Sequence, residues 1–376
     1  MPAQKVMITA WDLCTNVLLT NLEAVAPTFS ERLNGAGPFN ISLDLTDHTV
    51  SEQTSVILGL DGIPFKVIFS DPDTEQIFFT GIARTQTMDP SSPLLPITGT
   101  MLTGYFDSVF AAKSYTTSTT PAKLLYNVIQ DVQTLVPGAQ VFVTPSYRMA
   151  NPPPSFVPGY QLGQRIKVSQ IMNDLTMGIT AGYGGVDYYM SSSFQPVGGP
   201  KHLLNICAPR CGIDATQSGL VIDLTTAATW SYAVDNSASS NETVVVGSGT
   251  GASQPVSDVF SDVLVGGLGQ PPRQQALYQY NRVTSQSHLD SIARGASEMF
   301  QNPVRVFTVT LPVDYASCQL GGFSIGDDVL VTSPAAGTPY FPHGLSQWWR
   351  IVAYQVTYPT EGTASVVLTL NTPPVF

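Results

Sequence analysis

The chain has 376 residues, of which 43% are hydrophobic and 11% are charged, and it contains 29 Pro and 31 Gly. This composition is typical of a multidomain, mainly β protein with short strands joined by tight turns, and its 17 Phe, 4 Trp and 15 Tyr argue against a disordered chain. The formal net charge of −11 disfavours stable binding to nucleic acid, because no basic cluster is available to neutralise phosphates.

Targeting signals and disulfides are not expected. Asp12 and Asn16 interrupt the apolar N-terminus, which argues against an export signal, and no apolar run approaches the roughly 18 residues of a membrane-spanning helix. The cysteines are too few and too scattered for a disulfide framework, which fits synthesis in a reducing cytoplasm. They are Cys14, Cys207, Cys211 and Cys318.

The first β unit is predicted from residue 39 onward. Apolar residues alternate with polar ones over residues 39–45, as in a strand with one buried face. Strands at 65–69 and 77–82 flank the turn-forming segment 70–74 and predict a hairpin. A strand at residues 95–101 completes the unit.

The next part of the chain contains helical as well as strand patterns and predicts a small α+β insertion. Thr120 and Pro121 supply the cap and the first residue of a helix that ends at the Val-Pro-Gly segment 136–138. A second amphipathic stripe covers residues 168–179, and residues 183–190 are expected to form a strand.

A third helix is expected from Ser287, which would cap it with Asp290 completing an approximate capping box, to the Asn-Pro pair at 302–303. The Gly-, Ser- and Pro-rich segment 247–272 shows no periodicity and is predicted to be a long loop or an extended arm.

The last part of the chain repeats the plan of the first unit. An alternating strand leads to a Gly/Asp turn, a short strand and a final pair of strands, with Leu-Asp-Gly at 60–62 matching Gly-Asp-Asp at 326–328. We therefore predict a structural duplication of residues 39–101 and 307–370, against coincidence among generic β sequences. The strands of the second unit are expected at residues 307–311, 329–332, 349–357 and 364–370.

One motif suggests an enzyme. Residues 322–326 read Gly-Phe-Ser-Ile-Gly and match the nucleophile elbow of hydrolases, which requires a strand before Ser324, a helix after it and a histidine held by an acid. Here the following Asp-Asp pair leads into another strand and His343 is the only downstream histidine, so a plain turn is favoured.

Two loops superficially match ligand-binding motifs. The Gly-Ser-Gly-Thr-Gly segment 247–251 lacks the Lys and the helix of a phosphate loop. Asp71, Asp73 and Glu75 alternate like calcium ligands but lack the glycine and the distal glutamate of an EF-hand. A solvated loop is the favoured interpretation of both.

Cys207 and Cys211, with His202 nearby, could supply three zinc ligands, but a fourth is not evident. Two buried thiols are favoured over a zinc site or a local disulfide.

Trp348 and Trp349 are adjacent on a predicted strand, so one should face the core and the other the opposite side. Both are candidate subunit contacts, with packing inside the chain as the competing interpretation.

The order of these elements resembles the tail hub proteins of phages, typified by the trimeric hub of contractile-tail baseplates and the tail-associated minor tail proteins of siphophages. The resemblance covers nearly the whole chain and lies in arrangement rather than in one motif. The segments that carry it are Leu-Asn-Gly at 33–35 before 39–43, Phe-Phe-Thr-Gly-Ile at 78–82, Ile-Thr-Gly at 97–99 before 105–113, the helix at 289–300, the turn at 323–327 and the strands over 349–370.

The resemblance implies a mainly β fold in which duplicated tail-tube-like β-barrel or sandwich domains carry smaller α+β insertions. The expected parts are a first tube-like domain at 1–113, an α+β insertion at 114–205, a second tube-like domain at 206–285 and 304–376 that includes the long loop, and a helical insertion at 286–303.

The resemblance further implies a structural virion protein of the phage tail tip, made in the bacterial host cytoplasm, with no catalytic, cofactor-binding or metal-binding residue. Three subunits would form a ring that adapts the sixfold tail tube to the threefold tip. The implied partners are further copies of the chain in a homotrimer, the tail tube or distal tail protein, other tail-tip proteins or fibres, and the tape-measure protein, with DNA only in transit.

The ring is expected to enclose a passage with neutral to acidic walls, since a trimer of such acidic chains must expose its charge and basic walls would retain DNA. The alternative is that the acids are spread over the outer surface for solubility. The candidate lumen-facing residues, from the polar faces of the two units, are Asn40, Ser42, Asp44, Thr308 and Thr310. A carbohydrate- or receptor-binding tail-tip protein and a tail-associated hydrolase remain as alternative functions.

Overall fold

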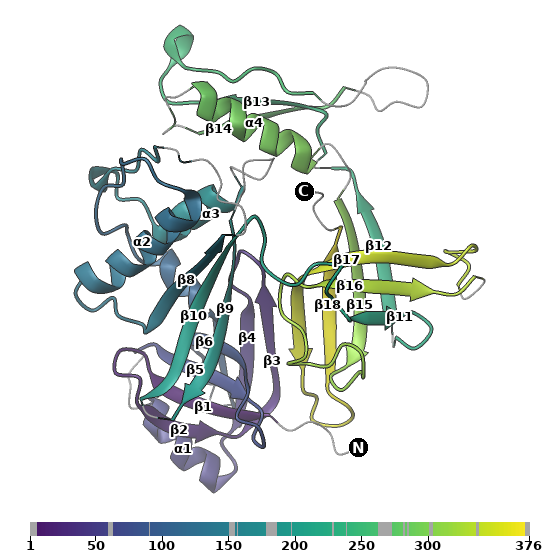
Figure 1. Cartoon of the computed structure of the whole chain (residues 1–376). Coiled ribbons are helices and arrows are strands. Elements are labelled where there is room, and N and C mark those ends of the chain that lie inside the picture. The colour runs from purple at the N-terminus through teal and green to yellow at the C-terminus, as the bar shows by residue number, and fades with distance from the viewer. Residues whose placement is uncertain are drawn as a thin grey trace.

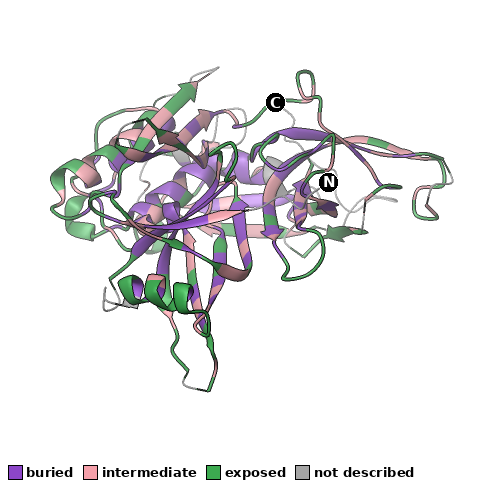
Figure 2. Cartoon of the chain, turned by 90° about the horizontal axis from the view of Figure 1, so that it is seen from below, coloured by how far each residue is buried: buried purple, intermediate pink, exposed green. Residues whose placement is uncertain are grey.

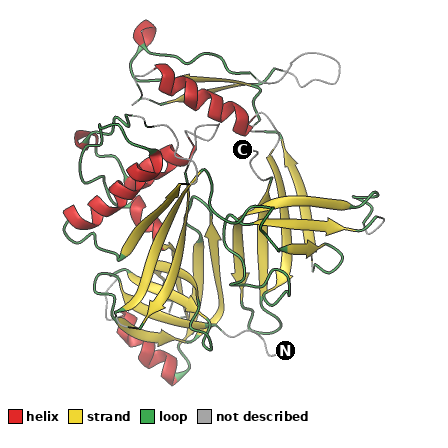
Figure 3. Cartoon of the chain, in the orientation of Figure 1, coloured by secondary structure: helices red, strands yellow, loops and turns green. Residues whose placement is uncertain are grey.

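The chain is mainly β, as predicted from its sequence. In the computed structural model, strands account for more of the described residues than helices do. Figure 3 shows the strands in the middle of the molecule and the helices at its periphery. The structure describes residues 6–58, 63–89, 91–149, 155, 157–177, 186–196, 198–227, 229–237, 239–261, 273–280, 283, 286–300, 304–335 and 338–372.

One large sheet runs through the molecule (Figure 1). Its hydrogen-bonded neighbours follow the order β12-β15-β18-β17-β3-β4-β7-β6-β5-β1-β2, with β16 paired to β17 and β11 paired to β16. Its strands from the first part of the chain are β1 (Met7–Asp12), β2 (Leu18–Leu22), β3 (Ala24–Arg32), β4 (Pro38–Asp44), β5 (Phe65–Ser70), β6 (Ile77–Gln86) and β7 (Leu94–Met101). Its later strands are β11 (Val221–Asp223), β12 (Thr229–Asp235), β15 (Val304–Pro312), β16 (Asp328–Ser333), β17 (Leu345–Thr357) and β18 (Ser365–Asn371).

The sheet contains the same strand order twice. The first module runs β3-β4-β7-β6-β5-β1 and the second module runs β12-β15-β18-β17-β16-β11. Phe39 lies opposite Gly99 as Phe307 lies opposite Leu370, and the fourth strand of each module carries a bulge at the corresponding place, after Ala83 in β6 and after Ile351 in β17. The strand order required by the predicted duplication is therefore present, although the matched turn at 60–62 lies outside the described residues.

Over the described residues, the sheet is not closed as a β-barrel would be, and the two modules differ from each other in their last pair of strands. Among the described strands, β12 and β2 end the path and no pairing joins them, so the modules share one open sheet and are not closed separately. β1 is antiparallel to β5, whereas β11 is parallel to β16.

Alternation of apolar residues explains why β4 and β15 form. Phe39, Ile41 and Leu43 of β4 are buried while the residues between them are partly or fully exposed, and β15 buries Phe307, Val309 and Leu311 in the same way. In the first module the Phe39 ring lies over two glycines. A Cβ atom at Gly81 or Gly99 would lie 2.6 or 2.5 Å from this ring, so no larger residue fits there.

An α+β insertion follows β7, as predicted. Its three-stranded sheet has the order β8-β10-β9. The Thr120 side chain caps α2 by accepting a hydrogen bond from the Lys123 backbone N–H, and the helix ends before Val136. The elements of the insertion are η1 (Leu102–Asp107), α2 (Pro121–Leu135), β8 (Val143–Met149), η2 (Leu162–Gln164), α3 (Val168–Met177), β9 (Asp187–Gln195) and β10 (Gly199–Ala208). The predicted helical residues 178–179 and strand residues 183–185 lie outside the described residues.

A separate small unit contains β13 (Glu242–Val246), β14 (Gln275–Gln279) and α4 (Gln286–Phe300). Its own core is formed by Val245 of β13 and by Leu289, Ile292 and Ala293 of α4. The expected division separated the helix from the preceding strands, and we propose instead that residues 242–300 are one unit. α4 begins at Gln286, so Ser287 lies inside the helix and the prediction that it caps the helix is wrong.

The remaining elements are α1 (His48–Leu58), which contacts β2 and β4, and η3 (Gly251–Ser253). Within segment 247–261, the described part of the predicted long loop, Val256 and Phe260 form isolated bridges to β13. Figure 2 shows that buried residues follow the strands, whereas exposed residues gather on helix surfaces and loop tips.

Candidate functional site: the outward polar face and the module junction

The five candidate lumen-facing residues lie on one face of the large sheet. Asn40 is exposed, and Ser42, Asp44, Thr308 and Thr310 are partly exposed, each alternating with buried neighbours. Residues that lie opposite one another on paired strands share a face, so strand register connects the two modules.

Three rows of paired residues trace this face. The first crosses seven strands and joins β15 to β6, while the second and third contain Thr310 and Thr308. The rows are Pro312-Ser365-Thr357-Thr28-Asn40-Thr98-Thr85, Thr229-Thr310-Val367-Gln355-Ser30 and Ser231-Thr308-Thr369-Ala353-Arg32. Because Pro312 shares its face with Thr308 and Thr310, the sequence candidates from both modules belong to one continuous polar surface.

This surface is rich in hydroxyl and amide groups and poor in charge. The three rows contain one charged residue, Arg32, and Asp44 ends β4 on the same face. The Thr46 hydroxyl donates a 2.7 Å hydrogen bond to the Asp44 carboxylate and lowers the pKa of Asp44 below its ordinary value. Asp44 therefore carries its negative charge at neutral pH.

The two adjacent tryptophans divide between the two faces of β17. Trp349 is 1% exposed, and its ring centroid lies 5.4 Å from that of Phe307. Trp349 is thus part of the chain's own core, and the prediction that it contacts another subunit is not supported. Trp348 is partly exposed and remains the candidate contact of the pair.

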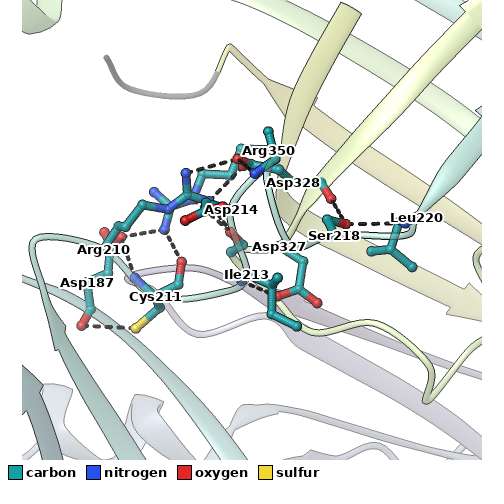
Figure 4. A network of polar contacts seen from close by, with 12 residues as sticks. Asp187, Arg210, Cys211, Ile213, Asp214, Ser218, Leu220, Asp327, Asp328 and Arg350 are labelled. Carbon is teal, nitrogen blue, oxygen red and sulfur yellow. Dashed lines mark hydrogen bonds and ion pairs between the residues drawn. The ribbon is translucent and has the colours of Figure 1, made fainter. Parts of the chain in front are cut away.

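A buried polar network joins the first module, the insertion and the second module, and Figure 4 shows its contacts between the segment 187–220 and the second module. Arg210 donates to both carboxylate oxygens of Asp328, at 3.0 and 2.7 Å, and Arg350 pairs with Asp187. The Asn34 side-chain amide, which follows β3, donates to the other Asp187 oxygen at 2.8 Å. This module junction replaces solvent around each charge with fixed partners, as a buried ion pair requires.

Backbone groups complete the junction. Arg350 also donates to the carbonyl oxygens of Gly326 and Cys211, at 3.1 and 2.8 Å. The Asp327 carboxylate accepts from the backbone N–H groups of Ile213 and Ser324, both at 2.8 Å. The segment after β10 is thereby fixed against the turn that precedes β16.

A second buried acid lies where the two modules meet. Glu31 of β3 lies opposite Tyr354 of β17, and the two side chains are hydrogen-bonded. Burial raises the pKa of Glu31 from 4.5 to about 8, and the bond from Tyr354 only partly opposes this shift. Glu31 is therefore largely protonated at neutral pH.

The nucleophile-elbow motif is a turn. The described chain continues from residues 322–326 directly into β16 without an intervening helix, and the Asp327 carboxylate is used to bind the Ser324 backbone. This arrangement lacks the helix N-terminus on which a nucleophile elbow depends.

The two loop motifs have structural roles. Asp71 accepts hydrogen bonds from the backbone N–H groups of Asp73 and Thr74, at 2.8 and 2.9 Å, and thereby shapes the β5–β6 turn. Segment 247–251 leads from β13 into the short 3-10 helix η3, and the Gly247 N–H donates to the Pro255 carbonyl.

His202 and Cys207 lie on the same strand, five residues apart, so their side chains point to opposite faces of β10. His202 is buried and its Nδ1 lies 2.9 Å from the Ser192 hydroxyl, whereas the Cys211 thiol lies 3.4 Å from the Asp187 carbonyl. Cys207 and Cys211 are free thiols. These positions do not form a three-ligand zinc site.

Over the described residues, no group of three or more His, Cys, Asp or Glu side chains is arranged to hold a metal ion. Likewise, no helix in the described part of the chain has the length and apolar character needed to cross a membrane.

Comparison with known proteins gives likeness in structure only. No family model and no curated protein matches the sequence. A tail protein from Neisseria meningitidis has 13% identity and a TM-score of 0.58, covering 98% of this chain and 96% of that chain. The 43 kDa tail protein of prophage MuSo2 from Shewanella oneidensis has 10% identity and a TM-score of 0.58, covering 98% of each chain.

A third similar structure comes from a secretion system. It is a component of the E. coli type VI secretion system, itself described as structurally similar to the T4 bacteriophage tail proteins gp27 and gp5. It has 10% identity and a TM-score of 0.51, covering 98% of this chain and 76% of that chain. At these identities the likeness concerns the fold, and it confirms the resemblance at that level: the chain has the fold of phage tail proteins.

Proposed function

We propose that the chain is a structural protein of a phage tail tip or baseplate hub, in which three copies form a ring around a passage. The observation that carries this proposal is the duplicated module: two copies of one strand order lie edge to edge in a single sheet. Three such subunits present six similar modules, which is the geometry needed to meet a sixfold tube with a threefold assembly.

The polar surface traced by the three rows of paired residues is the proposed wall of the passage. It is continuous across both modules, and its rows carry hydroxyl and amide groups with little charge. Such a wall offers no row of cations to bind phosphates, so DNA or a tape-measure protein would pass without being retained. The proposed partners are the tail tube or distal tail protein, other tail-tip proteins or fibres, and the tape-measure protein.

Hydrolysis is not part of the proposal, because Ser324 lies in a turn that runs into a strand. A carbohydrate- or receptor-binding role has no specific support from the described surface.

Native mass spectrometry of the full chain at increasing concentration tests the ring. We expect an assembly of three 40.2 kDa chains. A stable dimer with a twofold interface would contradict it. Electron microscopy of the same sample should show a central opening, and DNA binding should be weak; tight, salt-sensitive DNA binding would contradict the proposed lining.

A further inference from the structure

The contact between the two modules is a strand pairing, and the chain contains it once. The N-terminal half of β17 pairs with β16 through residues 345–350, whereas its C-terminal half pairs with β3 through residues 353–357. Both halves use the same edge of β17, because the other edge is occupied by β18. The change of partner occurs at the bulge after Ile351.

The first module has the same strand with the same bulge, but its second half lacks a partner. β6 pairs with β5 only as far as Ile82, and the other edge of β6 continues along β7 to Gln86. The Thr87 N–H extends that side by donating to the Pro96 carbonyl at 3.3 Å. Among the described strands, none pairs with the remaining edge of residues 83–89, which corresponds to the edge of β17 that binds β3.

The matching free strand is β12. Phe29 of β3 lies opposite Phe39, and Tyr232 of β12 lies opposite the equivalent Phe307. β3 is paired on both edges, by β4 and β17, whereas β12 pairs only with β15 within the described chain. One protomer therefore carries both halves of a second contact of the same kind, in β12 at one end of the sheet and in β6 of the other module.

Exposure supports this correspondence. In the internal contact, Val356 is fully buried and Phe29 is 1% exposed. Their counterparts by register are Met88, which is 70% exposed, and Tyr232, which is 39% exposed. Val234, the counterpart of Glu31, is 53% exposed. Large apolar side chains on an open strand edge are a site for strand addition.

We propose that β12 of one protomer pairs antiparallel with residues 85–89 of the next protomer and so closes the ring. This inference rests on the proposed ring and specifies its subunit contact. Transfer of the internal register places Thr85 opposite Asp235, Thr87 opposite Ala233 and Asp89 opposite Ser231. The contact is head to tail, because each protomer contributes one strand to each neighbour.

Disulfide cross-linking tests the register. The full chain is prepared with Cys14, the exposed cysteine, replaced by Ser, and with Thr87→Cys and Ala233→Cys, whose Cα atoms would be near enough to bridge. Oxidation should give a covalent trimer. A mixture of two single variants, one carrying Thr87→Cys and the other Ala233→Cys, should give covalent dimers that contain one chain of each.

Two matched pairs control the experiment. Gln355→Cys with Ser30→Cys reproduces the same positions in the internal contact and should form a disulfide within one chain. Thr87→Cys with Val234→Cys places the two thiols on opposite faces and should cross-link poorly. A native trimer that resists cross-linking, while the internal pair oxidises, would overturn the strand pairing and leave the ring intact. A twofold dimer would overturn both.

A charge at the proposed contact gives a second test. Val234→Lys should raise the concentration needed for half-maximal assembly by at least about tenfold. The lysine would lie opposite Gln86, within the proposed apolar contact between β12 and residues 85–89. Val259→Lys, at a residue that is 61% exposed and outside β12, is the matched control and should assemble like the parent. Equal assembly of both variants would contradict the proposal.

Discussion

Replacing Glu31 with glutamine should change how the stability of the protein depends on pH. Burial between β3 and β17 raises the pKa of Glu31 from 4.5 to about 8. A carboxyl with a raised pKa binds its proton more tightly in the folded state, so it favours folding at low pH and this advantage is lost as the pH rises from about 4.5 to about 8. At about 1.4 kcal/mol per pH unit, this group should lower the free energy of unfolding by about 3 kcal/mol between pH 5 and pH 7.

The assay compares wild type with Glu31→Gln by denaturant unfolding at several pH values across this window. The amide still accepts a hydrogen bond from Tyr354 but cannot ionise, so the variant should gain stability over wild type by about 1.4 kcal/mol for each unit of rising pH. Burial also lowers the pKa of His202 to about 3 and that of Lys66 to about 8, but both groups titrate in both proteins and cancel in the difference. If the difference in the free energy of unfolding between the two proteins does not change with pH, this account of Glu31 at the contact between β3 and β17 is refuted.

Three further substitutions test the core, the junction and the turn. Trp349→Ala should lower the free energy of unfolding by about 3–5 kcal/mol, whereas Trp348→Ala should cost less than about 1.5 kcal/mol in the isolated chain; equal losses in thermal or denaturant unfolding would contradict the assigned faces. Asp328→Ala should cost about 3–5 kcal/mol because it leaves Arg210 buried without its partner, and a loss no larger than that of the exposed control Asp214→Ala would argue against the junction. Ser324→Ala should change stability by less than about 0.5 kcal/mol and leave infectivity unchanged; loss of a measurable ester- or peptidoglycan-cleaving activity would show that the turn is catalytic.

Strands with one buried face could be predicted from the sequence, because their side chains alternate between core and solvent. This holds for β4 and β15, whose apolar residues occupy every second position. β3 escaped prediction because a bulge between Val25 and Thr28 shifts its register and Glu31 lies among its buried residues. β12 escaped for the opposite reason, since it is an edge strand whose residues are mostly exposed.

The candidate site could be predicted from the sequence only in part, for similar reasons. Asn40 and Thr308 could be assigned to polar faces from alternation alone, but that both faces belong to one surface follows from the pairing of β3 with β17, which no local pattern encodes. The module junction was not predicted, because Asp187, Arg210 and Arg350 come from separate segments and each is an ordinary charged residue in its own sequence context.

The pairing of β3 with β17 also constrains how a newly made chain reaches its final structure. β3 is among the first strands to leave the ribosome, and its partner follows only after the insertion, the small unit and most of the second module have been synthesised. During that interval one edge of β3, with the apolar Phe29 side chain, has no partner, and such an edge readily captures strands of other chains. Joining the modules in one sheet thus makes folding of the first module depend on completion of the second, and it favours synthesis at low local concentration or with a chaperone bound to the open edge.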